Sequence, residues 1–384
     1  MALRSALARP SAVSRGRIAT RTVAMSAAPV AAPPKTVATD AAVRERAKAA
    51  ILGGLLADIA TMPLHWIYDV PKMNELLASK GMSAAAPEFF PEPSCPFYQH
   101  PFGALSPYGH ELIPLLQSMA ANGGEFDEHK YAEAFYNYFT VQEPNAYRNR
   151  SVRNLIAAWE EGKRGREVGD KDDFQANCFA KASLLVARYA GKPELRQVVE
   201  AAVRVQQNND NAVAYGLAGA LLLEKVVLGH SLEEALAWAT SEGGLPADLQ
   251  ALVERAVAAR TTPLRELTYE PVQYMQEMVG KHMAIKDELP PFTLAVWCNG
   301  PACGNPAAFT NVAMAAAVYG KDSGNAYVDG VRANLMAGGD NCSRSLLVGA
   351  LLAAQSGGSS LPAEWRAKAT KLAEYEALVD KLFV

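Results

Sequence analysis

From residue 40 onward, apolar residues recur at spacings of three and four along most of the chain. This spacing is typical of helices that bury one face. It predicts helices over residues 41–62, 127–142, 179–190, 194–207, 211–229, 231–242, 247–259, 326–338 and 362–382. We find no alternating run of β-branched residues between turn signals, which would predict a strand. The pattern therefore predicts an all-α fold.

Two long stretches, 81–109 and 286–306, interrupt the helical pattern and are rich in proline, glycine and aromatic residues. Such long loops inside a helical domain are often functional. Their aromatic content is not that of a flexible linker, and the chain shows no repeat of fixed period. Residues 40–384 are therefore expected to form a single compact multi-helix domain.

Residues 1–39 contain no acidic residue and six basic ones, among much alanine, serine, threonine, valine and proline. This composition is typical of an organellar transit peptide that continues into a Pro/Ala-rich spacer. We expect the chloroplast stroma as the destination, with the mitochondrial matrix as the alternative. A cytosolic tail without regular structure is the third interpretation.

Charge and cysteine usage exclude several classes of function. Removing the six N-terminal basic residues from the total of 37 leaves 31 against 40 acidic residues, a formal charge of −9. An acidic body argues against nucleic acid as a partner, because phosphate binding needs basic surface. No apolar run reaches the roughly 20 residues that span a bilayer, so no membrane partner is expected.

The five cysteines are odd in number and scattered, so they define neither a disulfide framework nor a zinc-knuckle spacing. The chain is expected to lie in a reducing compartment, where free thiols usually behave as small buried residues. A regulatory disulfide between Cys298 and Cys303 is left open beside free or buried thiols.

Four segments stand out, one of which is the middle stretch "KASLLVARYAGKPELRQVVEAAVRVQQNNDNAVAYGLAGALLLEKVVLG" over residues 181–229. "GGLLADIATMPLHW" contains Asp58 and His65 on and after an apolar helix, "LSPYGHELIPLLQSMAANGG" starts a helix, and "AGGDNCSRS" starts another at Asp340. Together with the helices between them, these segments resemble the ADP-ribosylglycohydrolase family over residues 45–357. The branch they most resemble is that of the jellyfish J-type crystallins. The resemblance implies an all-helical fold and hydrolysis of an N- or O-glycosidic bond to ADP-ribose, in an ADP-ribosylated or small-molecule substrate.

The resemblance also implies two magnesium ions held by the motifs, but the ligands differ here. The family's first-motif glutamate falls on His65, and its paired aspartates fall on Pro107 and Tyr108, or on Gly109 and His110. The second aspartate of the last motif is Cys342. Asp340 and Ser343 alone remain as weak metal ligands, although magnesium needs several hard oxygen ligands. We therefore expect the dinuclear magnesium site to be degraded.

The resemblance places His65, the 108–111 turn and the 340–343 turn in one cleft, with Asp340, Cys342 and His65 as the catalytic candidates. One hypothesis is a Cys–His pair, with the thiol pKa lowered at a helix N-terminus. Another is a mononuclear zinc site. A third is a glycosidase in which Asp340 acts as base with Glu111 or Asp58.

The fourth hypothesis is a non-catalytic, crystallin-like binding or structural protein, so whether the chain is an enzyme stays open. Arg344 is expected to meet a diphosphate with the Gly338 and Gly339 amides, or else to form a surface or intramolecular ion pair. The substrate-binding candidates are Gly338, Gly339, Ser343, Arg344, Asp58, His110 and Glu111. Asp58 has a second interpretation, as a residue that anchors a loop or caps a helix. Phe97, Tyr98 and Phe102 are candidates for stacking on an adenine, or for covering the core.

Overall fold

The computed structural model describes residues 40–321 and 324–383. The predicted transit peptide, residues 1–39, lies outside the described residues. The all-α prediction is confirmed, since the described residues form helices with a few isolated β-bridges. The α-helices are α1 Ala41–Thr61, α2 Val70–Ser79, α3 Pro107–Ala121, α4 Glu128–Asn137, α5 Arg150–Glu160, α6 Asn177–Ala180, α7 Ala182–Tyr189, α8 Leu195–Gln206, α9 Asp210–Val227, α10 Leu232–Ala239, α11 Ala247–Ala258, α12 Gln273–Ala284, α13 Pro291–Asn299, α14 Ala307–Tyr319, α15 Ala326–Met336, α16 Asn341–Ser356, α17 Ala363–Lys368 and α18 Leu372–Asp380.

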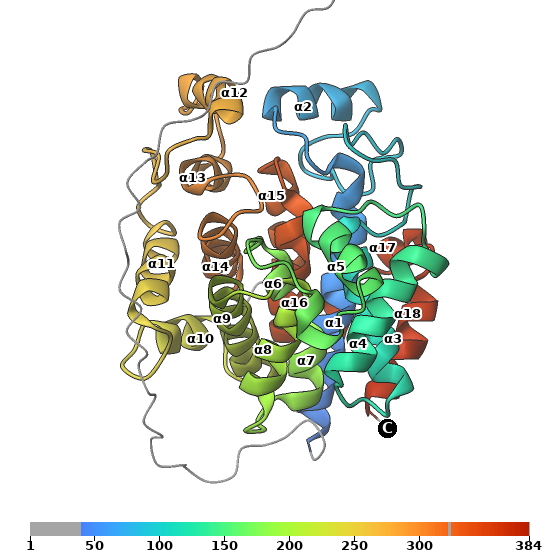
Figure 1. The fold of residues 1–384 in the computed structure, drawn as a ribbon. Helices are drawn as coiled ribbons and strands as arrows, with labels where there is room; N and C mark the ends of the chain where they lie inside the picture. The colour runs from blue at the N-terminus through green and yellow to red at the C-terminus, as the bar shows by residue number, and fades with distance from the viewer. Residues whose placement is uncertain (1–39, 322–323, 384) are drawn as a thin grey trace, which may run out of the picture. The chain divides into compact units, whose positions relative to one another are not determined.

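The helices α1 and α16 cross at the centre of the core (Figure 1). Glycines on both helices allow the backbones to meet. A Cβ atom on Gly53 would lie 2.2 Å from Cβ of Ala353, and one on Gly349 would lie 2.5 Å from the carbonyl oxygen of Gly53. Because only glycine permits so close an approach, this crossing fixes how the C-terminal end of α1 faces the N-terminal end of α16.

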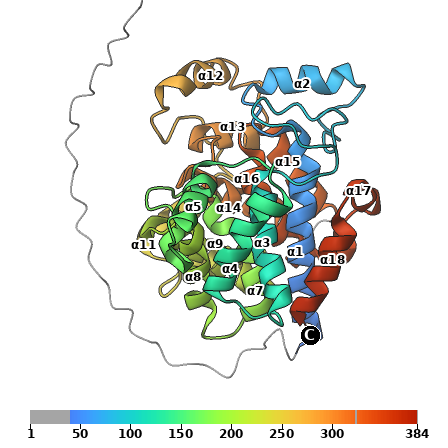
Figure 2. The same ribbon diagram turned by 45° about the vertical axis from the view of Figure 1, so that its right-hand side comes forward.

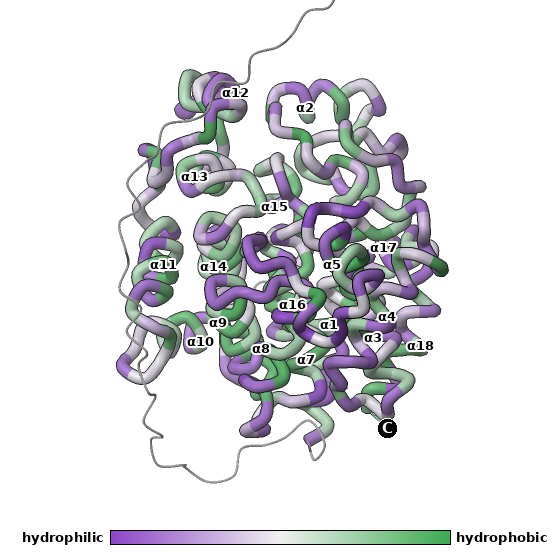
Figure 3. Tube along the Cα trace, viewed as in Figure 1, coloured by the Kyte–Doolittle hydropathy of each residue, from purple (hydrophilic) through white to green (hydrophobic). Residues whose placement is uncertain are grey.

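The remaining helices surround this crossing. In Figure 2, α3 and α18 lie beside α1. The helices α7 and α9 pack against both α1 and α16. Figure 3 shows mainly hydrophobic colouring along α7 and α14, whereas hydrophobic and hydrophilic turns alternate along the peripheral α11. The apolar spacing in the sequence thus corresponds to helices that bury one face or all faces.

One stretch, Ala41–Leu64, is the single helical segment of the described chain that is apolar and long enough to cross a membrane. The sequence analysis found no apolar run of that length. Within the fold, 89% of its most apolar window is buried by the rest of the protein. Such burial is what the central helix of a packed core shows.

The expected loop over 286–306 is partly wrong, because α13 forms inside it. Pro291 occupies the first turn of α13, where its missing N–H costs nothing. Every residue from Phe292 to Asn299 is buried, so the helix has no polar face and the periodicity that reveals surface helices is absent. The loop over 81–109 is confirmed up to Ser106, the residue that caps α3.

The segments α2, α12 and α13 lie together at one end of the domain (Figure 1). His282 of α12 stacks on Trp297 of α13 with ring centroids 3.7 Å apart. The Nε2 atom of His282 accepts a hydrogen bond of 3.1 Å from the backbone N–H of Val70, at the start of α2. These contacts place α12 over the end of the domain where α16 begins.

Candidate functional site

The turn before α16 brings Asp340 into the interior. Gly338 and Gly339 adopt φ values of 70° and 62°, which other residues rarely adopt. Gly339 also has no room for a side chain, because a Cβ would lie 2.6 Å from the carbonyl oxygen of Pro301. Its carbonyl accepts a hydrogen bond of 2.9 Å from the N–H of Trp66, which ties this turn to the segment after α1.

Asp340 is completely buried, and both oxygens of its carboxylate are engaged. Oδ1 lies 2.8 Å from Nε2 of His65 and also caps α16 by accepting from the N–H of Ser343. Oδ2 accepts a hydrogen bond of 2.8 Å from the hydroxyl of Tyr108. Burial alone would raise the pKa of Asp340, but the interactions with His65 and Tyr108 outweigh it and hold that pKa well below its ordinary value.

Burial lowers the pKa of His65, so its imidazole is neutral at physiological pH. Because a carboxylate only accepts, Nε2 of His65 carries the proton and donates to Asp340. Nδ1 therefore accepts the hydrogen bond of 2.8 Å from the hydroxyl of Tyr98. Both ring nitrogens of His65 are occupied by these two partners.

Arg344 is also buried, and its guanidinium is satisfied inside the protein. It donates to Oδ1 of Asn334 at 2.7 Å, to the carbonyl of Gly338 at 2.9 Å and to the carbonyl of Pro301 at 3.1 Å. Arg344 thus holds the glycine turn in place. It also adds a buried positive charge close in sequence to the buried carboxylate of Asp340. These three acceptors are neutral groups of the protein, so the guanidinium forms neither the expected diphosphate contact nor an ion pair within the described residues.

Cys342 is buried behind this turn and faces α1. Its Sγ atom lies 3.4 Å from the hydroxyl of Thr61 and 3.9 Å from the carbonyl oxygen of Asp58. The expected lowering of its pKa is wrong, because burial and the nearby carboxyl of Asp58 raise the pKa of this thiol well above its ordinary value. The Cys–His pair does not form either, since His65 is bound to Asp340 and Tyr98.

Asp58 corresponds to its second interpretation, as an anchor for a neighbouring helix. Its carboxyl accepts hydrogen bonds from the backbone N–H of Ser106, at 2.8 Å, and from the Ser106 hydroxyl. Ser106 is the N-cap of α3, so Asp58 fixes where that helix begins. Burial raises the pKa of Asp58 to about 7.

The structure does not bring Glu111 and His110 to Asp340. Glu111 lies in a separate buried polar cluster, where it accepts hydrogen bonds from Asn149, Asn177 and Gln206. The side chain of His110 forms its hydrogen bond with the hydroxyl of Tyr138 instead of contacting Asp340. Consecutive residues on a helix diverge by about 100°, which accounts for the separation.

A cavity of about 600 Å³ opens in front of Asp340, and we call it the aromatic lobe. Its aromatic lining consists of Trp66, Tyr68, Phe97, Tyr108, Tyr147 and Tyr274. Trp66 stacks on His65 with centroids 4.3 Å apart and has a φ of 57°, an unusual backbone conformation for a bulky residue. Phe97 and Tyr274 are 62% and 82% exposed although they are aromatic. The aromatic lobe thus combines a buried carboxylate with open aromatic walls.

Of the three aromatic residues singled out from the sequence, only Phe97 lines this lobe. Tyr98 bonds to His65, and Phe102 packs against Phe89 in the core. Trp66, Tyr147 and Tyr274 also line the lobe but were not predicted from the sequence, because they carry no spacing signal. Trp66 is the last residue of the first quoted segment, directly after His65, and that adjacency was the one available hint.

Within the described residues, no group of three or more His, Cys, Asp or Glu side chains is arranged to hold a metal ion. Ser343 donates its hydroxyl to the carbonyl oxygen of Asp340 rather than presenting it to the aromatic lobe. The five cysteines are free, and Cys303 is the one that is partly exposed.

Comparisons with known proteins agree with this architecture. Crystallin J1A of Tripedalia cystophora is 29% identical over 349 residues, covering 88% of this chain and 96% of the crystallin. Crystallin J1B of the same organism is 29% identical over 336 residues, covering 84% and 91%. A solved structure of an ADP-ribosylglycohydrolase-related protein complex shares the fold, with a TM-score of 0.61 and 17% identity over 89% of this chain and 98% of that chain. The family model for ADP-ribosylglycohydrolase matches residues 39–384, and the chain therefore belongs to the ADP-ribosylglycohydrolase family.

Proposed function

We propose that this chain is a ligand-binding member of its family that holds an ADP-ribosyl compound in the aromatic lobe without magnesium-dependent hydrolysis. The observation that carries the proposal is the state of Asp340. Both of its carboxylate oxygens lie 2.8 Å from groups of the chain itself, Nε2 of His65 and the hydroxyl of Tyr108. A group engaged in this way is a structural acceptor rather than a metal ligand.

The neighbouring residues do not fit magnesium. A dinuclear magnesium centre needs several carboxylate, carbonyl or water oxygens on each ion. Here His65 and Tyr108 present N–H and O–H donors to Asp340, and these donors repel a cation. Cys342 offers a protonated sulfur that faces α1. We therefore derive no step of the proposed function through magnesium, and zinc has no better set of ligands.

Acid–base hydrolysis without metal lacks a suitable pair of groups. The low pKa of Asp340 makes it a weak base toward water. Asp58 and Glu111 have pKa values raised to about 7, but each is buried among its own hydrogen-bond partners and neither lines the aromatic lobe. Retaining and inverting glycosidases both need two carboxyl groups on either side of the scissile bond.

Ligand binding, by contrast, is supported by the shape and lining of the aromatic lobe. Its volume of about 600 Å³ is within the usual range for small-molecule sites. Exposed aromatic rings can stack on a nucleobase, which typically contributes about 1–3 kcal/mol for each base. Gln175 adds a polar side chain that can fix the orientation of a ribose.

The test combines binding with turnover. Titration calorimetry with ADP-ribose is expected to show saturable binding that is the same in EDTA and in excess magnesium chloride. Incubation with ADP-ribosyl-arginine and ADP-ribosyl-serine is expected to release no ADP-ribose in either condition. Release that requires magnesium and disappears in Asp340→Asn would overturn the proposal. Absence of any binding would equally overturn it, in favour of a purely structural, crystallin-like role.

We also propose that residues 1–39 direct the protein to the chloroplast stroma, on the basis of their composition alone. Fusion of these residues to a fluorescent protein tests this directly. Accumulation in mitochondria would support the alternative address, and diffuse cytosolic fluorescence would contradict both.

A further inference from the structure

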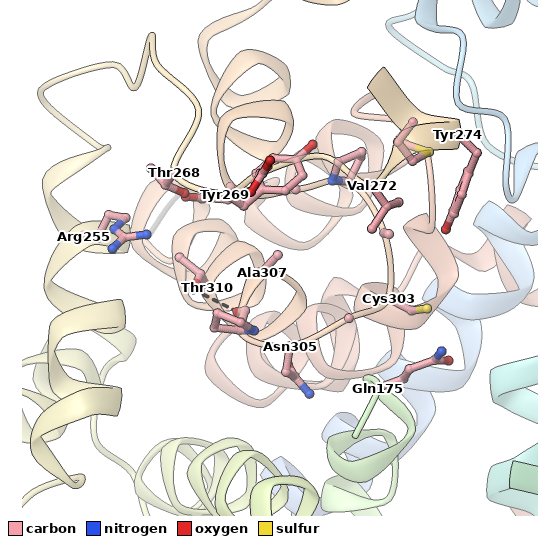
Figure 4. A pocket seen from close by; sticks show the side chains of 18 residues that line it. Gln175, Arg255, Thr268, Tyr269, Val272, Tyr274, Cys303, Asn305, Ala307 and Thr310 are labelled. Carbon is pink, nitrogen blue, oxygen red and sulfur yellow. Dashed lines mark hydrogen bonds between the residues drawn. The ribbon is translucent and has the colours of Figure 1, made fainter. Parts of the chain in front are cut away.

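A second cavity, of about 400 Å³, adjoins the aromatic lobe, and we call it the Arg255 lobe. Gln175, Tyr274 and Cys303 are among the residues that line both cavities. Figure 4 shows the Arg255 lobe, with Arg255 entering from α11 at one end and Tyr274 and Cys303 at the other. None of the sequence motifs falls in this lobe, and the proposed function does not use it.

Arg255 is a cation without an anion in the described structure. It lies in the last turn of α11, is partly buried, and forms no hydrogen bond or ion pair with any described residue. Its guanidinium points toward the loop that carries Thr268 and Tyr269 (Figure 4). The one carboxylate on this lobe, Glu270, is solvent-exposed and forms no ion pair with it in the described structure. Five N–H donors thus face the lobe without an acceptor.

Two further polar atoms of the same lobe lack partners. Oδ1 of Asn299 is buried in a side chain that is 3% exposed, and nothing donates to it. The Nδ2 atom of Asn299 donates to Oδ1 of Asn311 at 3.0 Å, which fixes the orientation of the amide. The hydroxyl of Tyr269 is likewise buried and unpartnered. Because leaving a buried polar atom unsatisfied costs about 1–3 kcal/mol, such atoms in a cavity point to a ligand.

We propose that the Arg255 lobe binds a small organic oxyanion that also carries a hydrogen-bond donor. The oxyanion meets the guanidinium of Arg255, and Tyr269, which lines the same lobe, offers a hydroxyl without a partner. An O–H or N–H of the ligand donates to Oδ1 of Asn299. Carboxylates and phosphates share this chemistry, since both accept several N–H bonds from one arginine. The inference rests on the Arg255 lobe alone and does not depend on the fate of a ligand in the aromatic lobe.

The experiment measures the binding of three probes to the full chain. Inorganic phosphate is titrated by ³¹P line width, and acetate and glycolate by saturation-transfer NMR. Glycolate differs from acetate by a hydroxyl, so tighter binding of glycolate reports the acceptor on Asn299. Arg255→Gln is expected to weaken binding of the preferred probe at least tenfold, and Arg255→Lys is expected to restore part of it.

Arg260→Gln is the matched control. It removes the same charge from the end of the same helix, but Arg260 lines a different cavity and lies 3.8 Å from Glu233. Binding within twofold of the wild type is expected for this control, and thermal unfolding shows that each variant is folded. A preference for phosphate assigns a phosphate ester to the lobe, and a preference for glycolate assigns a hydroxy acid. The proposal is overturned if no probe saturates, or if Arg255→Gln and Arg260→Gln behave alike.

Discussion

Nε2 of His65 lies 2.8 Å from Oδ1 of Asp340, and this contact joins the segment after α1 to the first residue before α16. The two residues are 275 positions apart in the chain and both are completely buried. A neutral imidazole that donates to an ionised carboxylate stabilises the carboxylate without adding a second charge. The contact therefore ties together, at the point where two central helices meet, two segments that are distant in the sequence.

Replacing Asp340 with alanine is expected to destabilise the fold by about 3–5 kcal/mol, because it leaves the buried Arg344 cation uncompensated. His65 and Tyr108 would each lose an acceptor as well. Urea unfolding in the presence of EDTA measures the loss. Asp340→Asn keeps an acceptor and the helix cap, and should retain part of the stability.

If Asp340 were mainly a metal ligand, the outcome would differ. Asp340→Ala would then leave the free energy of unfolding in EDTA nearly unchanged and would abolish a stabilisation by magnesium that the wild type shows. That pattern would contradict the structural role assigned to this carboxylate.

Cys342 is expected to be the slower of two thiols to react. Burial raises the pKa of both thiols well above its ordinary value, so the contrast rests on access. Cys342 is completely buried and is expected to resist alkylation at pH 8 in the native protein, whereas the partly exposed Cys303 is modified first. Mass spectrometry of peptides after timed labelling distinguishes the two sites, with labelling in urea as the reference for full reactivity. Preferential modification of Cys342 in the folded protein would restore the nucleophile hypothesis.

Two glycine substitutions are expected to have opposite effects on the free energy of unfolding. One lies where α1 and α16 cross, and the other lies on α12. Gly349→Ala would place a Cβ 2.5 Å from the backbone oxygen of Gly53, so overpacking is expected to cost about 1–3 kcal/mol or more. Gly280→Ala on α12 meets no atom within 4 Å and is exposed, so it is expected to stabilise by up to about 1 kcal/mol. Thermal unfolding of both variants measures the contrast, and a neutral Gly349→Ala would argue against the close crossing.

The sequence predicted the fold class because amphipathic spacing survives in most helices, and it failed at α13, whose buried faces leave no period. The helices α2, α5 and α14 were not predicted either. Among the site residues, motif position correctly brought His65 beside Asp340. It could not show that Glu111 turns away into a cluster with Asn149, Asn177 and Gln206, because the direction of a side chain depends on where the helix begins. The aromatic walls come from five separate segments, and only the tertiary fold assembles them.

His110 makes stability depend on pH. Burial, together with nearby His100 and Lys371, lowers its pKa from 6.5 to about 3. As the pH falls, His110 is therefore protonated in the unfolded chain before it is protonated in the folded protein. The neutral His110 makes its full contribution to the free energy of unfolding above pH 6.5. Below pH 6.5 the free energy of unfolding falls by up to about 1.4 kcal/mol per pH unit, until about pH 3.

His110→Gln keeps an acceptor for the Tyr138 hydroxyl but does not titrate, so its stability should fall less steeply between pH 6.5 and 4 than that of the wild type. Urea midpoints at several pH values provide the measurement. His230→Gln, at an exposed position, is the control and should follow the wild-type curve. Parallel curves for His110→Gln and the wild type would show that His110 is already protonated in the folded state.

The aromatic walls give the sharpest test of ligand binding. Phe97 is 62% exposed and lines the aromatic lobe, so its truncation removes a stacking surface without opening the core. Phe97→Ala is expected to weaken ADP-ribose binding by about 1–3 kcal/mol, roughly 5- to 150-fold, if the ring stacks on the adenine. Val141→Ala, at a position 71% exposed and outside this lobe, should leave the affinity unchanged. Calorimetry on both variants measures the two affinities. An unchanged affinity of Phe97→Ala for ADP-ribose would show that the adenine does not stack on Phe97.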